Sequence, residues 1–89
     1  MKVQYDPEFV EKLKKQNVRV SNSFRKAIKI FSKNPADPRL HVHELKREYK
    51  GLKSIDVTVN WRAIYEEITE GNDLIIYFVT LGTHRQLYK

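Results

Sequence analysis

The most regular apolar run in the chain extends from Leu74 to Leu81 and is built from β-branched, aromatic and aliphatic residues. A run of this length and composition is typical of a buried strand rather than of an amphipathic helix. We therefore expect residues 74–81 to form the central strand of a sheet. Gly82 follows the run, and its conformational freedom predicts a turn there. Such a turn would carry Thr83, His84 and Arg85 off the sheet together at one edge.

A short alternating segment and a helix signal open the chain. Val3 and Tyr5 alternate with polar residues, which predicts a short first strand at an edge of the sheet. Asp6 can cap free backbone amides and Pro7 suits the first position of a helix, so a helix is expected to begin here. Three basic side chains of this helix are expected to face water: Lys12, Lys14 and Lys15.

The clearest helical pattern follows Asn17. Apolar side chains recur at the spacing of one helix face, at Val20, Phe24, Ala27, Ile28 and Phe31. The opposite face carries Arg19, Arg25, Lys26, Lys29 and Lys33. An ordinary solvated face explains these cations, and direct contact with nucleic acid is the alternative. The segment 34–38 contains two prolines and is expected to end the helix.

The rest of the chain predicts a loop and a meander of strands. Residues 39–51 show no sustained period and are expected to form a structured loop. Residues 52–59 alternate between apolar and polar side chains, which is typical of a strand with one buried face. Asn60 is expected to begin a tight connection into a strand at 61–68, and residues 69–73 to form the hairpin loop that leads into the central strand.

This order of elements predicts an α+β fold. Two N-terminal helices would pack on one face of a mostly antiparallel sheet of about four strands, and the other face would stay available. Eighty-nine residues can bury one small core, so residues 1–89 are expected to form a single domain.

Composition removes several classes of function. The chain has no cysteine, which excludes disulfides, thiolate zinc sites and cysteine nucleophiles and fits a reducing cytoplasm. Neither a signal peptide nor a membrane span is evident, so we expect a cytoplasmic protein without a membrane partner. The three glycines are not arranged as a phosphate-binding loop, which excludes P-loop and dinucleotide-binding folds.

The charge is strongly basic and unevenly distributed. The net charge is +6 and the isoelectric point is near 9.7. Residues 1–65 hold 15 basic and 7 acidic side chains, whereas residues 66–89 hold 2 and 4. A polyanionic partner would suit this excess, although an ordinary solvated surface gives the same total.

Two other kinds of site find little support. His41, His43 and His84 could supply three nitrogen ligands, but their spacing is not specific to a metal, and we expect neither a metal nor another cofactor. Glu66 and Glu67 are neighbours on opposite faces of a strand and do not form the carboxylate pair of a glycosidase.

RNA cleavage fits the available side chains better. A metal-independent ribonuclease needs a base for the 2′-hydroxyl, an acid for the leaving oxygen and cations for the pentavalent phosphate. Histidines and arginines supply these groups. Trp61, Tyr49 and Tyr88 could hold a base by stacking. Packing in the core is the favoured interpretation for Trp61 and Tyr49, and both interpretations stand equally for Tyr88.

Four segments carry a resemblance to a known family. They are His-Glu-Leu-Lys at 43–46, Tyr-Lys-Gly-Leu-Lys-Ser-Ile-Asp-Val at 49–57, Trp-Arg-Ala-Ile-Tyr at 61–65 and Gly-Thr-His-Arg-Gln-Leu-Tyr at 82–88. In order and spacing they resemble the YafQ-like branch of mRNA interferases, within the RelE/ParE superfamily of toxin–antitoxin systems. The resemblance covers nearly the whole chain and is strongest in the C-terminal half.

The resemblance implies an endoribonuclease that enters the ribosomal A site, near the rRNA, and cuts mRNA by 2′-hydroxyl attack, leaving a cyclic phosphate. It also implies a cognate antitoxin that wraps the toxin in a hetero-oligomer and blocks the site. His43 matches a loop histidine of the branch's active site, His84 matches its tail histidine and Tyr88 its terminal aromatic. Trp61 matches an aromatic residue next to an active-site acid.

Three positions depart from the branch. Asp56 stands where these enzymes can have a catalytic histidine, Asn60 where an aspartate is used, and Thr80 where an arginine would stabilise the phosphate. A carboxylate at position 56 would repel the scissile phosphate unless it were protonated or salt-bridged. The positive charge at the reaction centre is therefore expected from Arg85, Lys46, Lys53 or Arg62.

These arguments lead to one hypothesis, a toxin that acts as a ribosome-dependent mRNA endonuclease and inhibits translation. His84 would be the principal acid or base, with His43 as its partner or as a phosphate ligand. Arg85 would offset charge in the transition state and Tyr88 would position the mRNA. The expected RNA-binding residues are Lys46, Arg47, Lys50, Lys53, Arg62 and Trp61.

Two alternatives remain open from the sequence. The chain could be a non-enzymatic, gyrase-inhibiting toxin of the ParE kind, or a catalytically weakened relative that only binds RNA or antitoxin. The endonuclease hypothesis requires that the His84 ring turn back over the open face of the sheet, toward the basic loop at residues 39–53.

Overall fold

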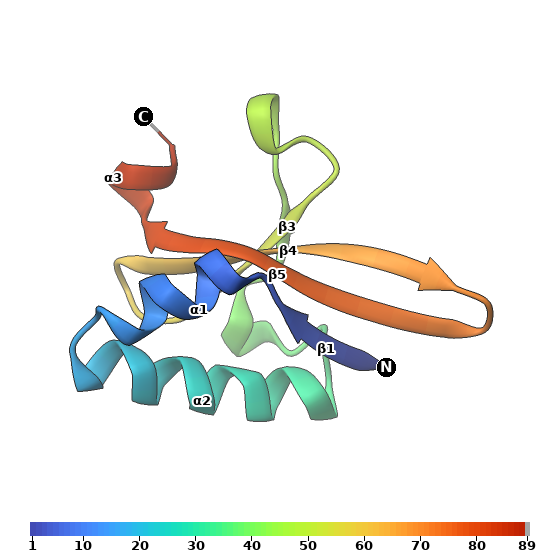
Figure 1. Ribbon diagram of the computed structural model, residues 1–89, viewed down its shortest axis with the longest axis horizontal. Helices are drawn as coiled ribbons and strands as arrows, with labels where there is room; N and C mark the ends of the chain where they lie inside the picture. The colour runs from blue at the N-terminus through green and yellow to red at the C-terminus, as the bar shows by residue number, and fades with distance from the viewer. Residues whose placement is uncertain (89) are drawn as a thin grey trace.

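The computed structural model describes residues 1–88, which fold into a five-stranded sheet with two long helices on one face (Figure 1). The strand order is β1-β5-β4-β3-β2. In chain order the elements are β1 (Lys2–Tyr5), α1 (Pro7–Lys14), α2 (Val18–Lys33), the short helix η1 (Pro38–Leu40), β2 (His43–Glu44), η2 (Arg47–Tyr49), β3 (Lys53–Asp56), β4 (Trp61–Glu70), β5 (Asp73–Thr83) and α3 (His84–Leu87).

The expected α+β class is confirmed, but the sheet differs in two respects. It has five strands rather than about four, because the loop contributes the two-residue strand β2. It is also mixed, because β1 lies at the edge and runs parallel to β5. β1 and β5 are the first and last strands in the chain, so no tight turn joins them and their pairing need not be antiparallel.

Both long helices begin where the sequence predicts. Asp6 accepts a hydrogen bond from the Glu8 amide (2.9 Å), and Asn17 accepts from the Arg19 and Val20 amides. Asp6 also accepts from the Tyr77 hydroxyl (2.7 Å), which ties the start of α1 to β5. That hydrogen bond, followed by the one from the Glu8 amide, holds the pKa of Asp6 below its ordinary value.

The main core lies between the two helices and the sheet and is dominated by aromatic rings. Phe9, Phe24, Phe31, Tyr65 and Phe78 are buried and contact one another with ring centroids 5.2 to 6.1 Å apart. The apolar stripe of α2 predicted by the sequence supplies two of these rings. Burial, with a smaller contribution from the Glu67 charge, raises the pKa of Tyr65 to about 12.

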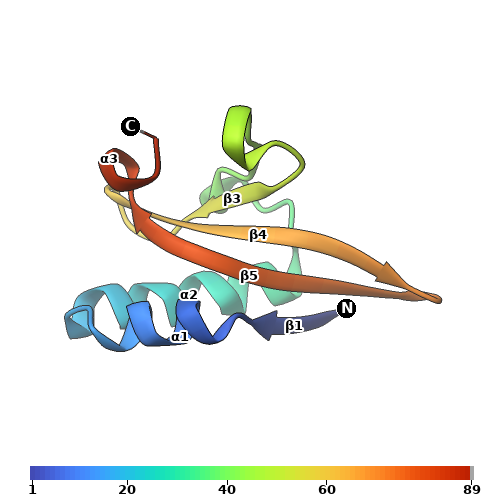
Figure 2. The same ribbon diagram turned by 45° about the horizontal axis from the view of Figure 1, so that its top comes forward.

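The opposite face of the sheet, called the outer face below, carries a second and smaller cluster. It consists of buried Leu45, Ile64 and Leu87, with Tyr49, Leu52 and Tyr88 packed against them. Leu45 comes from the loop, Ile64 from β4 and Leu87 from α3. The loop and α3 therefore meet above the outer face, where Figure 2 shows both of them on the side away from α1 and α2.

The expected turn at Gly82 is wrong. Gly82 lies inside β5 and pairs with Arg62, and the strand continues to Thr83. A Cβ atom at position 82 would approach the Gln86 and Leu87 side chains to 3.1 and 3.2 Å. The glycine therefore permits α3 to pack onto the strand, whereas the chain changes direction at the reciprocal Thr83–Gln86 capping box.

The strand limits also differ from expectation. The strand predicted at 52–59 is β3, which ends at Asp56, and the Thr58 hydroxyl then accepts from the Asn60 and Trp61 amides in the tight connection predicted there. The β4–β5 hairpin loop shrinks to Gly71 and Asn72. Both differences arise because cross-strand partners set strand length. Among residues 1–88, no helix is long and apolar enough to span a membrane.

Candidate functional site

His84 is the first residue of α3 and is exposed at the end of the outer face. Its backbone amide donates to the Asn60 carbonyl (3.0 Å), which joins α3 to the β3–β4 connection. Its ring packs edge-on against Tyr88 with centroids 4.7 Å apart. Together with its exposed neighbour Arg85 it borders a depression of about 400 Å³, lined by Asn60, Trp61, Thr83, His84 and Arg85.

Tyr88 belongs to the smaller core rather than to the surface. It packs in the outer-face cluster, and its ring also meets Tyr49 at right angles, with centroids 6.4 Å apart. Its hydroxyl is buried and has no hydrogen-bond partner among residues 1–88. Tyr88 therefore supports the His84 ring, and Tyr49 takes the packing role that the sequence favoured.

His43 lies on β2, and both of its ring nitrogens have partners. Nδ1 is 2.8 Å from the His41 carbonyl, and Nε2 is 3.2 Å from the hydroxyl of fully buried Ser54. A carbonyl only accepts, so Nδ1 carries a proton, and the neutral ring accepts from Ser54 through Nε2. This fixed orientation suits a positioned polar contact better than free proton exchange.

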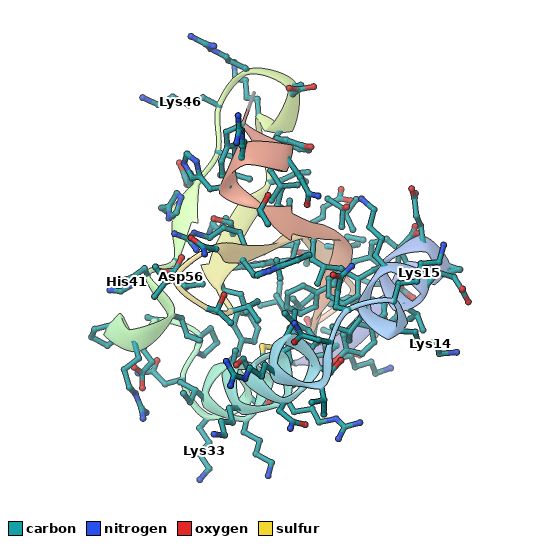
Figure 3. The ribbon with its side chains drawn as sticks, turned by 90° about the vertical axis from the view of Figure 1, so that its left-hand side faces the viewer. Lys14, Lys15, Lys33, His41, Lys46 and Asp56 are labelled. Atoms are coloured by element: carbon teal, nitrogen blue, oxygen red, sulfur yellow. The ribbon has the colours of Figure 1, made fainter. Side chains whose placement is uncertain are left out.

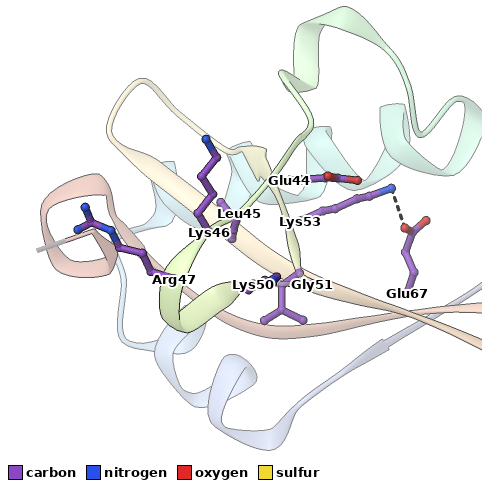
Figure 4. A pocket seen from close by; sticks show the side chains of 9 residues that line it. Glu44, Leu45, Lys46, Arg47, Lys50, Gly51, Lys53 and Glu67 are labelled. Carbon is purple, nitrogen blue, oxygen red and sulfur yellow. Dashed lines mark ion pairs between the residues drawn. The ribbon is translucent and has the colours of Figure 1, made fainter.

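The basic loop forms a depression of about 680 Å³ (Figure 4). Lys46, Arg47 and Lys50 are exposed and make no ion pair with residues 1–88. Lys53 instead pairs with Glu67 at 2.7 Å. Three of the four predicted loop cations therefore remain available to an anion, and the fourth is largely neutralised.

Arg62 serves the protein itself. Its Nε lies 2.8 Å from an Asp56 carboxylate oxygen, and one Nη donates to the carbonyls of Thr58, Val59 and Trp61. The side chain is only 17% exposed. Arg62 thus fixes the β3–β4 connection through Nε and one Nη, and its contact with RNA stays a prediction.

The Asp56 carboxylate has a side-chain partner on each of its two oxygens. One oxygen contacts Arg62, and the other lies 2.7 Å from Nδ1 of His41. Figure 3 shows His41 and Asp56 directed toward one another at the edge of the sheet, on the same side of the molecule as Lys46. The repulsion of a phosphate that the sequence predicts at position 56 is therefore strongly reduced, because two cation-forming groups share the carboxylate.

A lysine from α1 meets Thr80. The Lys12 ammonium donates to the Thr80 hydroxyl at 2.9 Å, so this half-buried side chain does not simply face water as the sequence predicts. Thr80 pairs with Ile64 and shares the outer face with it. A depression of about 350 Å³ opens here, lined by Lys12, Gln16, Tyr49, Trp61, Thr80, Leu81, Gln86 and Leu87.

Trp61 is half-buried and packs against the main core, as the sequence favoured. It also borders the depressions at His84 and at Lys12, which therefore share an indole wall. Among residues 1–88, no group of three or more His, Cys, Asp or Glu side chains is placed to bind a metal.

No family model and no curated protein sequence matches this chain. Solved structures do. YafQ from E. coli strain BL21(DE3) superposes with a TM-score of 0.76 and 23% identity, over 98% of this chain and 97% of YafQ. The E. coli DinJ–YafQ toxin–antitoxin complex matches with a TM-score of 0.74 and 22% identity, over 98% of this chain and 96% of the matched chain. The YoeB/ParE toxin from Agrobacterium tumefaciens matches with a TM-score of 0.75 and 16% identity, over 94% of this chain and 99% of the toxin.

The chain has the RelE/ParE toxin fold. The expectation of a YafQ-like architecture is thereby confirmed, since the helices, the sheet and the tail superpose over nearly the full length of both chains.

On this RelE/ParE fold the predicted residues divide into groups. His84, Arg85 and Trp61 border one depression, whereas Lys46, Arg47, Lys50 and Lys53 border another, and His43 borders neither. The outer-face cluster connects the two groups, because it contains Leu45 from the loop and Leu87 from α3.

Sequence reasoning missed two side chains of this RelE/ParE fold. It weighed His41 only as a metal ligand, and it placed Lys12 in water. Their contacts span 15 and 68 residues. No local sequence pattern indicates contacts between residues so far apart. The only available signal was that Asp56 and Thr80 depart from the family pattern and would need partners elsewhere in the chain.

Proposed function

We propose that this protein is the toxin of a toxin–antitoxin system and cleaves mRNA on the ribosome. The observation that carries the proposal is the exposed His84–Arg85 pair on the outer face, with its imidazole packed on Tyr88. A histidine beside a fixed cation is the minimum needed to exchange protons next to a phosphodiester. The similarity in fold to YafQ supports the same assignment.

In this proposal the 2′-hydroxyl of the mRNA attacks the adjacent phosphorus, and the 5′ oxygen leaves. His84 exchanges one of the two protons, and the exposed His43 makes a polar contact to the phosphate. Arg85 and Lys46 offset the negative charge that develops on the phosphoryl oxygens. Lys12, which stands beside Thr80, adds a further ammonium at the same end of the outer face.

The remaining loop cations would bind the RNA and ribosomal backbone. Lys46, Arg47 and Lys50 are exposed around the depression at the basic loop and suit contacts to phosphates. The same surface would attract an acidic antitoxin segment. The DinJ–YafQ structure is a toxin–antitoxin complex, and a comparable cover over the outer face is proposed for this chain.

The test is to express the wild type, His84→Ala and a matched control without antitoxin, and to map mRNA 5′ ends on translating ribosomes. Lys33→Ala is the control, because Lys33 is an exposed cation on the helix side (Figure 3). New ends and growth arrest are expected with the wild type and Lys33→Ala but not with His84→Ala. Equal growth and no new ends in all three strains would refute the endonuclease assignment.

A second candidate function is a non-enzymatic toxin that binds gyrase. Two observations favour it: Lys53 and Arg62 are held in ion pairs, and the YoeB/ParE toxin superposes well. Supercoiling by purified gyrase separates the two functions. Inhibition of gyrase together with intact mRNA on ribosomes would support this candidate against the endonuclease.

A further inference from the structure

The Asp56 carboxylate joins two side chains from different parts of the chain. One oxygen lies 2.7 Å from Nδ1 of His41, and the other lies 2.8 Å from Nε of Arg62. The carboxylate is 22% exposed and the guanidinium 17%, whereas the imidazole is 71% exposed. Asp56 and Arg62 thus form a fixed support that holds the His41 ring exposed to solvent.

The contact with Asp56 decides which nitrogen of His41 is reactive. Because a carboxylate accepts hydrogen bonds, the proton of the neutral ring belongs on Nδ1. The lone pair is then on Nε2, which has no hydrogen-bond partner among residues 1–88. A histidine held by a carboxylate at one nitrogen and free at the other has the arrangement of a general base.

The backbone holds the same ring in place. His41 has φ 46° and ψ 49°, the left-handed region that residues other than glycine seldom adopt. Its amide donates to the Pro38 carbonyl (3.2 Å), and its own carbonyl accepts from the ring of His43. Strained conformations that persist in this way concentrate at functional sites.

Strand pairing links Asp56, the partner of His41, to the end of β5 that leads into His84. Asp56 pairs with Arg62 across β3 and β4, and Arg62 pairs with Gly82 across β4 and β5. Two strand spacings of about 4.8 Å put the Cα atoms of Asp56 and Gly82 roughly 10 Å apart. His84 follows Gly82 by two residues, and Arg62 also holds the connection whose Asn60 carbonyl binds the His84 amide.

We propose that His41 is the general base of the cleavage reaction, with Asp56 as the residue that positions it, an inference that rests on the proposed function. The 2′ oxygen forms its bond to phosphorus as its proton moves to Nε2 of His41. The bond from phosphorus to the 5′ oxygen breaks as His84 gives that oxygen a proton. The products are a 2′,3′-cyclic phosphate and a 5′-hydroxyl, and no other reactant is needed.

The central variant is His41→Asn. Asparagine tolerates the left-handed backbone of position 41 and lacks the imidazole, so the fold is retained. Asp56→Asn removes the charge that positions the ring. Asp37→Asn is the matched control, because it breaks another exposed carboxylate pair on the same loop, the one with Arg39 (2.8 Å), and leaves His41 untouched.

Single-turnover cleavage of mRNA on purified ribosomes is the main measurement. His41→Asn is expected to lower the rate about 100-fold or more, the usual contribution of a general base, and to abolish the acidic limb of the pH–rate profile. Asp56→Asn is expected to lower the rate by a smaller factor, and Asp37→Asn to match the wild type. A wild-type rate and profile in His41→Asn would overturn the assignment to His41 and leave the proposed function standing.

A modified substrate separates the base from the acid. When the leaving 5′ oxygen is replaced by sulfur, departure needs no proton. This substrate is expected to rescue His84→Ala and not His41→Asn, and rescue of His41→Asn would overturn its role as base. If the wild type cleaves neither substrate, the proposed function itself fails, and the assignment of His41 falls with it.

The geometry has a readout that does not depend on activity. Long-range ¹H–¹⁵N spectra of the histidine rings are expected to show the Nδ1–H tautomer for the neutral form of His41. Asp56→Ala is expected to shift that ring toward the Nε2–H tautomer, which free histidine favours. An unchanged tautomer in Asp56→Ala would refute the positioning role of Asp56.

Discussion

The two faces of the sheet differ in how many side chains they bury and in how many charged groups they carry. On the helix side, five aromatic rings fill a continuous core, and Phe9, Phe31 and Phe78 are completely buried. On the outer face a smaller apolar cluster is built on buried Leu45, Ile64 and Leu87, and exposed cation-forming side chains such as Lys46, His84 and Arg85 lie near it. The helix side therefore carries most of the stability, and the outer face carries the groups that can act on a substrate.

This difference means that the candidate catalytic histidines on the outer face are held in place by only a few contacts each. α3 has only four residues, and it is held by Leu87, by its capping box and by one hydrogen bond from His84 to Asn60. His41 depends on a single carboxylate. Small changes on the outer face should therefore abolish function while the molecule stays folded, whereas equal changes on the helix side should unfold it.

The largest expected effect is on the helix side. Phe78→Ala is expected to lower the free energy of unfolding by about 3–5 kcal/mol, because a fully buried ring at the centre of the aromatic core is replaced by a cavity. Small domains are stable by about 5–15 kcal/mol, so little stability would remain. Urea denaturation measures the change, and a loss below about 1 kcal/mol would contradict the assigned role of this core.

Leu87→Ala tests the outer face with a comparable truncation. The expected loss of stability is near 2 kcal/mol, the low end for a buried leucine, since the small cluster at the end of the chain can relax. Cleavage should fall much further than stability, because α3 loses the contact that orients His84. Unfolding and cleavage should be measured on one preparation. Equal losses of stability and of cleavage would contradict the proposed difference between the two faces of the sheet.

Gly82→Ala tests how closely α3 packs on β5. The added methyl group would meet the Leu87 and Gln86 side chains at 3.2 and 3.1 Å, so these side chains must give way by a few tenths of an ångström. Overpacking of this kind costs about 1 kcal/mol or somewhat more. Hydrogen exchange should accelerate in residues 84–88 and remain unchanged in α2, and equal protection throughout would show that the close approach is unimportant.

Lys12→Met tests the ammonium beside Thr80. Methionine keeps most of the apolar stem and removes the charge, so stability should change by less than about 0.5 kcal/mol. Loss of one charge contact of about 1.4 kcal/mol to the transition state would slow cleavage roughly tenfold. Lys15→Met, an exposed lysine on the same helical segment, serves as the control and should cleave at the wild-type rate.

The smallest effect concerns acid stability of the loop. Hydrogen bonds from Arg39, side chain first and backbone second, lower the pKa of Asp37 to about 2. A lowered pKa stabilises the fold above the ordinary carboxyl pKa, and this contribution is lost as the pH falls through about 2. Asp37→Asn should therefore melt slightly below the wild type at pH 6 and equal to it near pH 2. A difference that grows on acidification would have the wrong sign.

Much of the architecture was accessible from the sequence. The α2 stripe, the Asp6 cap and the β4–β5 hairpin were predicted because each depends on neighbours a few residues away. The parallel pairing of β1 and the extra strand β2 were missed, since strand partners are chosen across the whole chain. At the site, His84 and Arg85 line one depression, whereas Arg62 contacts Asp56 and Tyr88 packs in the outer-face cluster, and the roles of all four in cleavage stay predictions.

The sequence by itself determined where helices and strands form and which residues could carry RNA chemistry, because periodicity, caps and composition act locally. The tertiary structure alone decided that Gly82 receives α3, that Lys12 meets Thr80 and that Asp56 holds His41. Those contacts depend on strand register and on the path of a loop. Both are fixed by burial of the whole core, so residues far apart in the chain become neighbours only after the sheet has closed on its helices.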